Sequence, residues 1–131
     1  MSDFFNVKSS IKDYEVILID SVATKLEEVY VTGDFIIIDE ILLKLNPDLK
    51  VVILDKNVIS IEALEITKSY EGVIPIIDKL IKSGFKRNNR IIAIGGGITQ
   101  DISAFIASIL YRGVGWIFFP TTLLGQGDSC I

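Results

Sequence analysis

The amino-acid sequence predicts an α/β fold, with a Rossmann-like, mainly parallel sheet flanked by helices. Short runs of β-branched and aromatic residues recur along the chain, and most are continuous rather than alternating, which suits parallel strands covered on both faces. Segments of helical period lie between the later runs, and strands that alternate with helices form parallel sheets with right-handed crossovers. The chain has 131 residues, of which 50% are hydrophobic, enough for one core and one domain.

Five apolar runs are the predicted strands. In chain order they are "YEVILI" at 14–19, "FIII" at 35–38, "KVVIL" at 50–54, "RIIAI" at 90–94 and "GWIFF" at 115–119. All of them are far shorter than the ~18 apolar residues that a membrane span requires. We therefore expect no contact with a membrane.

Two segments are predicted to be amphipathic helices. In 66–81 the residues expected to face the sheet are Ile66, Tyr70, Val73, Ile74, Ile77 and Ile81. Pro75 removes a backbone hydrogen bond unless it lies in the first turn, so this helix should start late or kink. In 98–111 the residues expected to face the sheet are Ile98, Ile102, Phe105, Ile106, Ile109 and Leu110.

Charge and cysteine content exclude several classes of function. The chain carries 13 basic and 17 acidic residues, and the basic ones are scattered, so nothing indicates a nucleic-acid partner. The single cysteine, Cys130, excludes an internal disulfide, and the first residues do not resemble a signal peptide, so we expect a cytoplasmic protein. The mean hydropathy of +0.50 predicts strands buried on both faces or a side that expects a partner.

Three consecutive glycines, Gly95, Gly96 and Gly97, follow a predicted strand and precede a predicted helix. Ligands of open α/β sheets bind beyond the carboxyl ends of the strands, where a helix N-terminus offers free N–H groups to a pyrophosphate. The alternative is a tight turn that needs glycine for its geometry alone. Asp101, four residues later, is either a hydroxyl acceptor beside that site or a carboxylate that complements the helix dipole.

A second polar loop, "PTTLLGQGDSC" at 120–130, follows the last predicted strand. Thr121, Thr122 and Asp128 could bind a ligand with many hydroxyl groups. A hydrogen-bonded turn of Ser, Thr and Asp explains the same residues equally well.

The order of these motifs is distinctive. The triple glycine and aspartate of "GGGITQD" are followed by "YRG" and "PTTLLGQGDS", while "IIIDE" at 36–40 and "EITKS" at 65–69 lie upstream. This order resembles the dehydroquinate synthases and their sugar-phosphate cyclase relatives, over most of the chain from about Tyr14 and most specifically over 95–129.

The resemblance implies an N-terminal Rossmann-like domain that binds NAD. It also implies a C-terminal domain of the same enzyme with a divalent metal, zinc or cobalt, whose ligands are not in this chain. Such enzymes cyclise a seven-carbon sugar-phosphate substrate by transient oxidation, phosphate elimination, reduction and an intramolecular aldol step, and NAD is regenerated each turn. The complete enzyme is expected to be a homodimer.

The resemblance further implies roles for individual residues. Those at the cofactor are Asp39 at the adenosine ribose, Glu65 and Lys68 beside cofactor and substrate, Gly95, Gly96 and Gly97 at the pyrophosphate, and Asp101, Thr121 and Thr122 at the riboses and nicotinamide end. Asp128 would be catalytic and meet the substrate. Arg112 would reach across a dimer interface to the substrate phosphate. Without the resemblance, an exposed ion pair explains Glu65 and Lys68. A solvated arginine after a helix explains Arg112 equally well.

Several features depart from the family pattern. Ile41 replaces a polar asparagine near the adenine ribose, Gly125 and Gly127 replace larger residues, and Cys130 replaces a small one, so substrate choice within the family stays open. The sequence has no histidine, whereas the family's zinc site uses two. We therefore expect an NAD-binding domain of a larger enzyme, inactive alone. The alternatives are the cofactor domain of a glycerol dehydrogenase-like polyol dehydrogenase and a stand-alone nucleotide-binding module.

Overall fold

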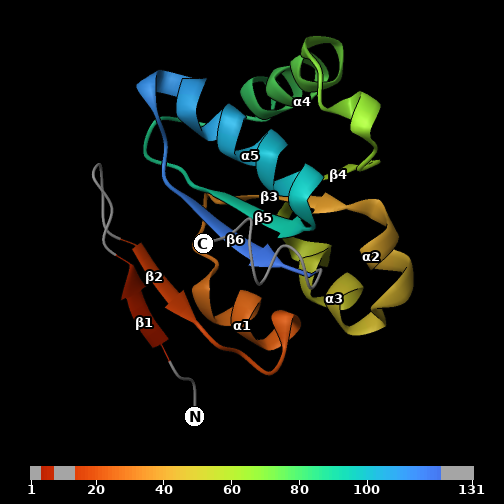
Figure 1. Cartoon of the computed structure of the whole chain (residues 1–131), viewed down its shortest axis with the longest axis vertical. Coiled ribbons are helices and arrows are strands. Elements are labelled where there is room, and N and C mark those ends of the chain that lie inside the picture. Colours follow the sequence, from red (N-terminus) through yellow and green to blue (C-terminus); the bar gives the residue numbers. More distant parts are fainter. Residues whose placement is uncertain (1–3, 8–13, 122–131) are drawn as a thin grey trace.

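The fold is a parallel sheet between two layers of helices (Figure 1). The computed structural model describes residues 4–7 and 14–121. The sheet has the strand order β4-β3-β5-β6, and every neighbouring pair is parallel. Its strands are β3 (Phe35–Asp39), β4 (Asn57–Ile61), β5 (Ile91–Gly95) and β6 (Trp116–Pro120). The predicted α/β class with a mainly parallel sheet is confirmed.

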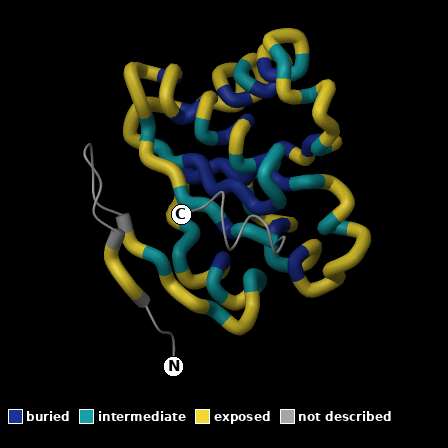
Figure 2. The backbone as a smooth tube through the Cα atoms, in the orientation of Figure 1, coloured by how far each residue is buried: buried dark blue, intermediate teal, exposed yellow. Residues whose placement is uncertain are grey.

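Helices cover both faces of this sheet. They are α1 (Val22–Val29), α2 (Glu40–Leu45), α3 (Pro47–Val52), α4 (Tyr70–Lys82) and α5 (Gly97–Ile109), with 3₁₀ turns η1 (Ile53–Asp55), η2 (Glu65–Thr67) and η3 (Leu110–Arg112). Along β3, Phe35 and Ile37 pack in one core with α4 and α5, whereas Ile36 and Ile38 pack in a second core with α1 and α3. The buried segments therefore gather in the central strands (Figure 2).

The predicted strand at 50–54 is wrong. Residues 47–52 form α3 and residues 53–55 form η1, because Pro47 stands in the first turn with Asp48, and Lys50 lies in the last turn. Leu49 and Ile53, four residues apart, turn their side chains into the core. The strand at this place in the fold is β4 instead, which alternates between exposed and buried residues as an edge strand does.

The first predicted strand forms, but outside the parallel sheet. β2 (Tyr14–Ile17) pairs antiparallel with β1 (Phe4–Val7) in a separate two-stranded sheet. The predictions at 35–38, 90–94 and 115–119 are confirmed as β3, β5 and β6.

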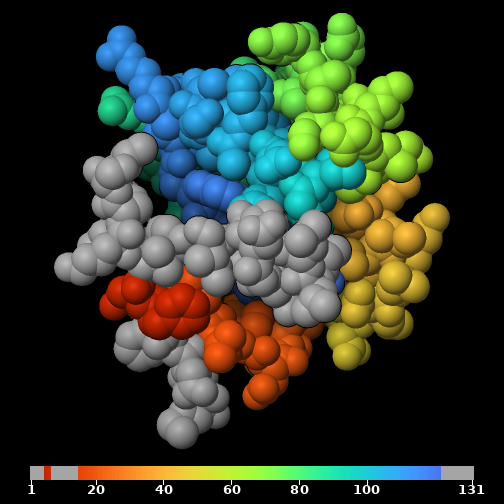
Figure 3. Space-filling model, viewed as in Figure 1, coloured from red at the N-terminus to blue at the C-terminus, as the bar shows by residue number. Residues whose placement is uncertain are grey.

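Helix α4 begins at Tyr70, so Pro75 lies inside the helix and not in its first turn, and the expected late start that would place the proline there is wrong. The helix also presents a different face to the sheet. Its buried residues are Val73, Ile76 and Leu80, whereas most of the stripe predicted to face inward is exposed, namely Ile66 (79%), Tyr70 (76%), Ile74 (60%) and Ile81 (51%). The segment is apolar on two sides, so periodicity identifies the helix without identifying its inner face. The side chains of α4 and α5 form one layer at the top of the space-filling view (Figure 3).

Helix α5 agrees more closely with its prediction. Ile102, Ile106 and Leu110 are buried against the sheet, while Phe105 and Ile109 are exposed. Among the residues that the structure describes, no helix is long and apolar enough to cross a bilayer.

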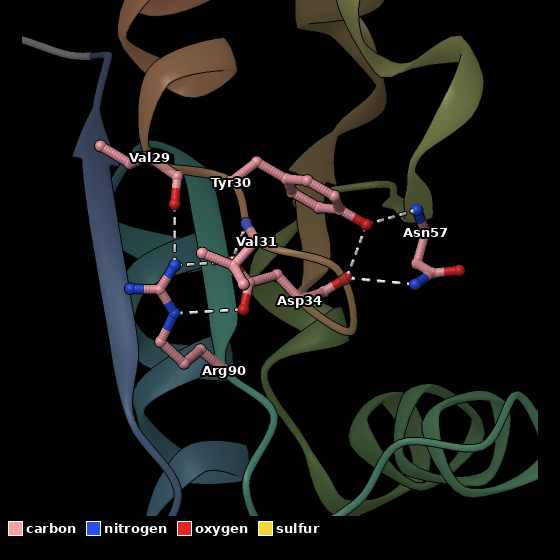
Figure 4. A network of polar contacts seen from close by, with 6 residues as sticks. All are labelled: Val29, Tyr30, Val31, Asp34, Asn57 and Arg90. Carbon is pink, nitrogen blue, oxygen red and sulfur yellow. Dashed lines mark hydrogen bonds and ion pairs between the residues drawn. The ribbon is translucent and has the colours of Figure 1, made fainter.

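A partly buried ion pair, in which Asp34 is buried and Arg90 is half-buried, ties together the starts of three strands (Figure 4). The carboxylate of Asp34, just before β3, accepts from Arg90 Nε at 3.1 Å and from Arg90 Nη2 at 2.7 Å, and its side chain is 4% exposed. Arg90 also donates to the carbonyl of Val29, and the carbonyl of Asp34 accepts from Tyr30 Oη and Asn57 Nδ2. The hydrogen bond to Asp34 raises the pKa of the Arg90 guanidinium, against the opposing effect of burial.

Candidate functional site

The strand order creates a topological switch point at the carboxyl edge of the sheet. From β3 the chain moves to β4 on one side, and from β4 it returns to β5 on the other side of β3. Such a reversal leaves a crevice beyond the strand ends, where open α/β sheets bind ligands. Ile38 is paired with Ile94, so Asp39 and Gly95, the next residues, end these neighbouring strands side by side.

The three glycines of the turn have different surroundings. Gly95 is the last residue of β5, and its carbonyl accepts from the N–H of Thr121 at 2.9 Å. A Cβ on Gly95 would lie 2.5 Å from Thr99 Oγ1, so this glycine allows the fully buried Thr99 to pack against the strand. The requirement for glycine at position 95 therefore comes from packing inside the chain.

Gly96 and Gly97 form the start of α5. Gly96 is the N-cap residue and offers no side chain to the first N–H groups, and Gly97 is the first helical residue. A Cβ on Gly97 would meet none of the described atoms within 4 Å, and its φ is not in the left-handed region. Glycine is also a poorer helix former than alanine. The described part of the chain thus gives no internal reason for glycine at 97, and the open space fits an anionic group on the helix N-terminus.

Three further predicted residues meet beside this turn. Lys68 Nζ lies 2.8 Å from Asp101 Oδ2 and 3.7 Å from Glu65 Oε1, and all three residues are exposed. Hydrogen bonding to Asp101, helped by the charges of Asp101 and Glu65, raises the pKa of the Lys68 ammonium group. The ion pair between Glu65 and Lys68 is as expected from sequence, whereas the contact between Lys68 and Asp101 was not predicted. The two residues lie 33 positions apart in the sequence, and only the packing of η2 near α5 brings them together.

Asp101 lies beyond the first turn of its helix, because α5 begins at Gly97 and has no acidic residue in its first turn. Since the helix dipole acts mainly on the first turn, the dipole explanation of Asp101 is weakened. The interaction that the structure shows for Asp101 is instead its ion pair with Lys68 at the sheet edge.

Asp39 caps α2 at the end of β3. Its Oδ1 accepts from the N–H of Ile41 at 3.2 Å, which is an ordinary N-cap bond. Oδ2 has no partner among the described residues. The side chain of Ile41 is 52% exposed. One carboxylate oxygen is thus free beside the glycine turn.

Arg112 lies apart from all these residues. α5 starts at the carboxyl edge and runs back to the opposite edge (Figure 1), so its 13 residues place Arg112 about 20 Å from the glycine turn. Tyr111 and Arg112 have φ values of 49° and 67°, in the left-handed region, followed by Gly113 at 110°. Each such non-glycine residue costs of order 1–3 kcal/mol. One copy of the chain therefore cannot bring Arg112 to its own glycine turn.

Of the three site residues predicted in the loop after β6, the structure describes only Thr121. Thr121 is bonded to the turn through its backbone, whereas Thr122 and Asp128 lie outside the described residues. Within 4–7 and 14–121, no group of three or more His, Cys, Asp or Glu residues could hold a metal ion. An open groove between α1 and α3, lined by Ser21, Glu27 and Asp48 among others, includes none of the predicted site residues.

The sequence of this chain is similar to those of several 3-dehydroquinate synthases. The family description "3-dehydroquinate synthase N-terminal" matches residues 58–131, more than half of the chain. A 3-dehydroquinate synthase of Rhizobium etli is 41% identical over 101 residues, which cover 73% of this chain and 27% of that protein. One of Streptococcus pyogenes is 48% identical over 65 residues, covering 50% of this chain and 18% of that protein. The matches thus span far less than the full length of these relatives.

Solved structures share the fold. A 2-deoxy-scyllo-inosose synthase complexed with carbaglucose-6-phosphate, NAD+ and Co2+ has a TM-score of 0.77 at 19% identity, covering 97% of this chain and 38% of that one. ValA, a 2-epi-5-epi-valiolone synthase from Streptomyces hygroscopicus with NAD+ and Zn2+ bound, has a TM-score of 0.65 at 30% identity, covering 75% of this chain and 29% of that one. The matched sequence includes the glycine turn, Lys68, Asp101 and Arg112. This chain belongs to the 3-dehydroquinate synthase family.

Proposed function

We propose that this chain is the NAD-binding domain of a 3-dehydroquinate synthase-like sugar-phosphate cyclase. The observation that carries the proposal is the open space over Gly97, at the start of a 13-residue helix and at the switch point of the sheet. Related structures hold NAD+ together with Co2+ or Zn2+. If the glycines served packing alone, the structure would not explain why position 97, which has open space around it, is a glycine.

In this proposal the pyrophosphate of NAD rests on the N–H groups of Gly97 and the following residues. The free oxygen of Asp39 accepts from the adenosine ribose, while Asp101 and Lys68 orient the rest of the cofactor and the substrate, with Glu65 beside them. Thr121 and Thr122 border the nicotinamide end. NAD, when bound, supplies a reversible acceptor of hydride, and the chain's own residues bind and orient it.

The activity of the complete enzyme is part of the same proposal. It would cyclise a seven-carbon sugar phosphate with a zinc or cobalt ion held by a C-terminal domain, a proposal supported by the Co2+ and Zn2+ of the related structures. Asp128 would then meet the substrate between the domains, and Asp128→Asn should slow turnover far more than it lowers Tm. A cytoplasmic location and a homodimer stay predictions. The polyol dehydrogenase alternative is not favoured by the relatives, which are cyclases.

Arg112 would serve the substrate phosphate of a second copy. Its distance from the glycine turn of its own chain supports this arrangement, and its side chain makes no hydrogen bond or ion pair with the described residues. A guanidinium group is well suited to a phosphate because its forked donors match two oxygens.

Gly97→Ala should separate NAD binding from folding. We expect Tm to stay the same or rise slightly, because alanine favours the helix, while the added methyl group occupies the cofactor's space and weakens NAD binding roughly tenfold or more. Calorimetric titration of the chain with NAD measures the affinity, and thermal unfolding measures Tm.

The matched control is Gly115→Ala, whose Cβ would lie 3.6 Å from Arg90 Cγ at the other edge of the sheet. It should leave NAD affinity unchanged. Equal affinities of wild type and Gly97→Ala would show that the glycine turn is only a turn. Wild-type chain that does not bind NAD at all would exclude an NAD site built by this chain alone.

Asp39→Asn should change the choice between NAD and NADP. Asparagine keeps the N-cap of α2 but removes the negative charge, so NAD should bind several-fold more weakly while NADP, with its 2′-phosphate, binds more tightly. Titration with both dinucleotides gives the ratio of Kd values. An unchanged ratio would remove Asp39 from the ribose site.

A further inference from the structure

Tyr111 lies in a turn with unusual backbone geometry that the proposed NAD site does not use. The residues Tyr111, Arg112 and Gly113 all have positive φ values, 49°, 67° and 110°. Tyrosine and arginine rarely adopt this conformation, and it persists only where surrounding contacts impose it. The contacts that impose it here can be named.

Two backbone hydrogen bonds close the turn. Gly113 N–H donates to the carbonyl of Leu110 at 2.8 Å, and Val114 N–H donates to the carbonyl of Ala107 at 2.8 Å. These bonds join the turn to the last part of α5. Both hydrogen bonds are between backbone groups, so they hold the backbone of the turn but not its side chains.

The side chain of Tyr111 supplies the remaining link. Its hydroxyl donates to the carbonyl of Phe85 at 2.9 Å, and its ring stacks on the ring of Phe85 with centroids 6.4 Å apart. Phe85 is 1% exposed and packs edge-on against Phe35 of β3, with centroids 5.4 Å apart. Tyr111 is thus fastened to the core of the domain by both its ring and its hydroxyl.

Arg112, the next residue, is exposed and has no hydrogen bond or ion pair with the described part of the chain. A long cation of this kind normally samples many directions. Here its Cα sits on a backbone held rigid on one side by Tyr111 and on the other by the bond from Gly113. The turn therefore limits the directions in which the guanidinium group can extend.

We propose that Tyr111 is a positioning residue that aims Arg112, through its hydrogen bond to Phe85, at the substrate phosphate of a second copy of the chain. This inference rests on the proposed function, because it needs Arg112 to bind that phosphate. Tyr111 itself touches neither cofactor nor substrate. Its loss should weaken phosphate binding without changing NAD binding.

The test is a double-mutant cycle in the complete two-domain enzyme. Tyr111→Phe removes the hydroxyl and keeps the ring, so KM for the seven-carbon sugar phosphate should rise roughly five- to tenfold while kcat and the KM for NAD stay within about twofold. The inhibition constant of inorganic phosphate, as a competitor of the substrate, should rise by the same factor as KM. In an Arg112→Ala background, Tyr111→Phe should have no further effect on KM.

Two more variants make the result specific. Tyr70→Phe is the matched control, since Tyr70 is 76% exposed and its hydroxyl bonds to none of the described residues, and it should leave every constant unchanged. Tyr111→Asn accepts a positive φ more easily but cannot reach Phe85, so it should raise KM as Tyr111→Phe does. A wild-type KM in either Tyr111 variant, or equal effects of Tyr111→Phe with and without Arg112, would overturn the inference.

The outcomes also separate this inference from the proposed function. If Arg112→Ala itself leaves KM for the sugar phosphate unchanged, Arg112 does not bind the substrate phosphate. The positioning role of Tyr111 is then wrong as well. If Arg112→Ala raises KM but Tyr111→Phe does not, only the inference about Tyr111 is wrong.

Discussion

Arg90→Leu should destabilise the chain by about 3 kcal/mol, a large part of the ~5–15 kcal/mol that holds a domain together. The substitution leaves the carboxylate of Asp34, which is 4% exposed, buried without its cation. It also removes the bond to Val29 and one link between the starts of β3 and β5. Thermal unfolding of the chain should show Tm lowered by roughly 10 to 20 °C.

Two variants test the cause of this loss. Arg87→Leu, in the same loop, removes an exposed arginine that has no ion pair among the described residues, and its Tm should match wild type. Adding Asp34→Asn to Arg90→Leu removes the uncompensated charge and should recover part of the lost stability. If Arg90→Leu melts at the wild-type temperature, the ion pair does not stabilise the fold.

If Arg112 binds the substrate phosphate as proposed, Arg112→Ala in the complete enzyme should lower kcat/KM about a hundredfold, because it would remove a charge-assisted, forked contact with that phosphate. Because Arg112 lies at the far end of α5 from the glycine turn, we also expect two variants to complement each other in a mixed dimer. Two strongly impaired variants, Arg112→Ala and Gly97→Val, should recover activity when their subunits are mixed.

In a mixed dimer, the subunit carrying Arg112→Ala keeps its own glycine turn and receives Arg112 from its partner. Random exchange makes half of the dimers mixed, each with one working site, so about a quarter of the wild-type activity should return. Turnover measured after subunit exchange gives this fraction. No recovery above the separate variants, with exchange verified by mass-tagged subunits, would mean that Arg112 does not act in a second copy.

Most of the sheet could be predicted from the sequence, and the failures have physical causes. The central strands β3 and β5 are continuous apolar runs without helix-start signals, which is typical of strands buried on both faces. The run at 50–54 looks similar but follows Asn46, Pro47 and Asp48, and these helix-start signals prevail over β-propensity. β4 was missed because an edge strand alternates, and "NVISI" has only five residues in which to show it.

The candidate site was predictable where it depends on chain order alone. Asp39 and Gly95 to Gly97 directly follow strands, so they must meet at the carboxyl edge once the strands are parallel. The contact of Lys68 with Asp101 joins residues 33 apart and depends on the packing of two segments, which no local pattern encodes. The positive φ of Tyr111 had no sequence signal either, because tyrosine and arginine rarely adopt it.

The strand order has a consequence for synthesis on the ribosome. β3 is the first strand of the parallel sheet to emerge, yet it lies inside the sheet and needs β5 on one side. From Asp39 at the end of β3 to Ile91 at the start of β5 the ribosome adds 91 − 39 = 52 residues, which takes roughly 3 to 10 s. During that time one edge of "FIIID" is unpaired in the nascent chain, even after β4 has formed. We therefore expect this strand to be the segment of the growing polypeptide that most needs a chaperone, and slowed translation of residues 62–90 to increase aggregation.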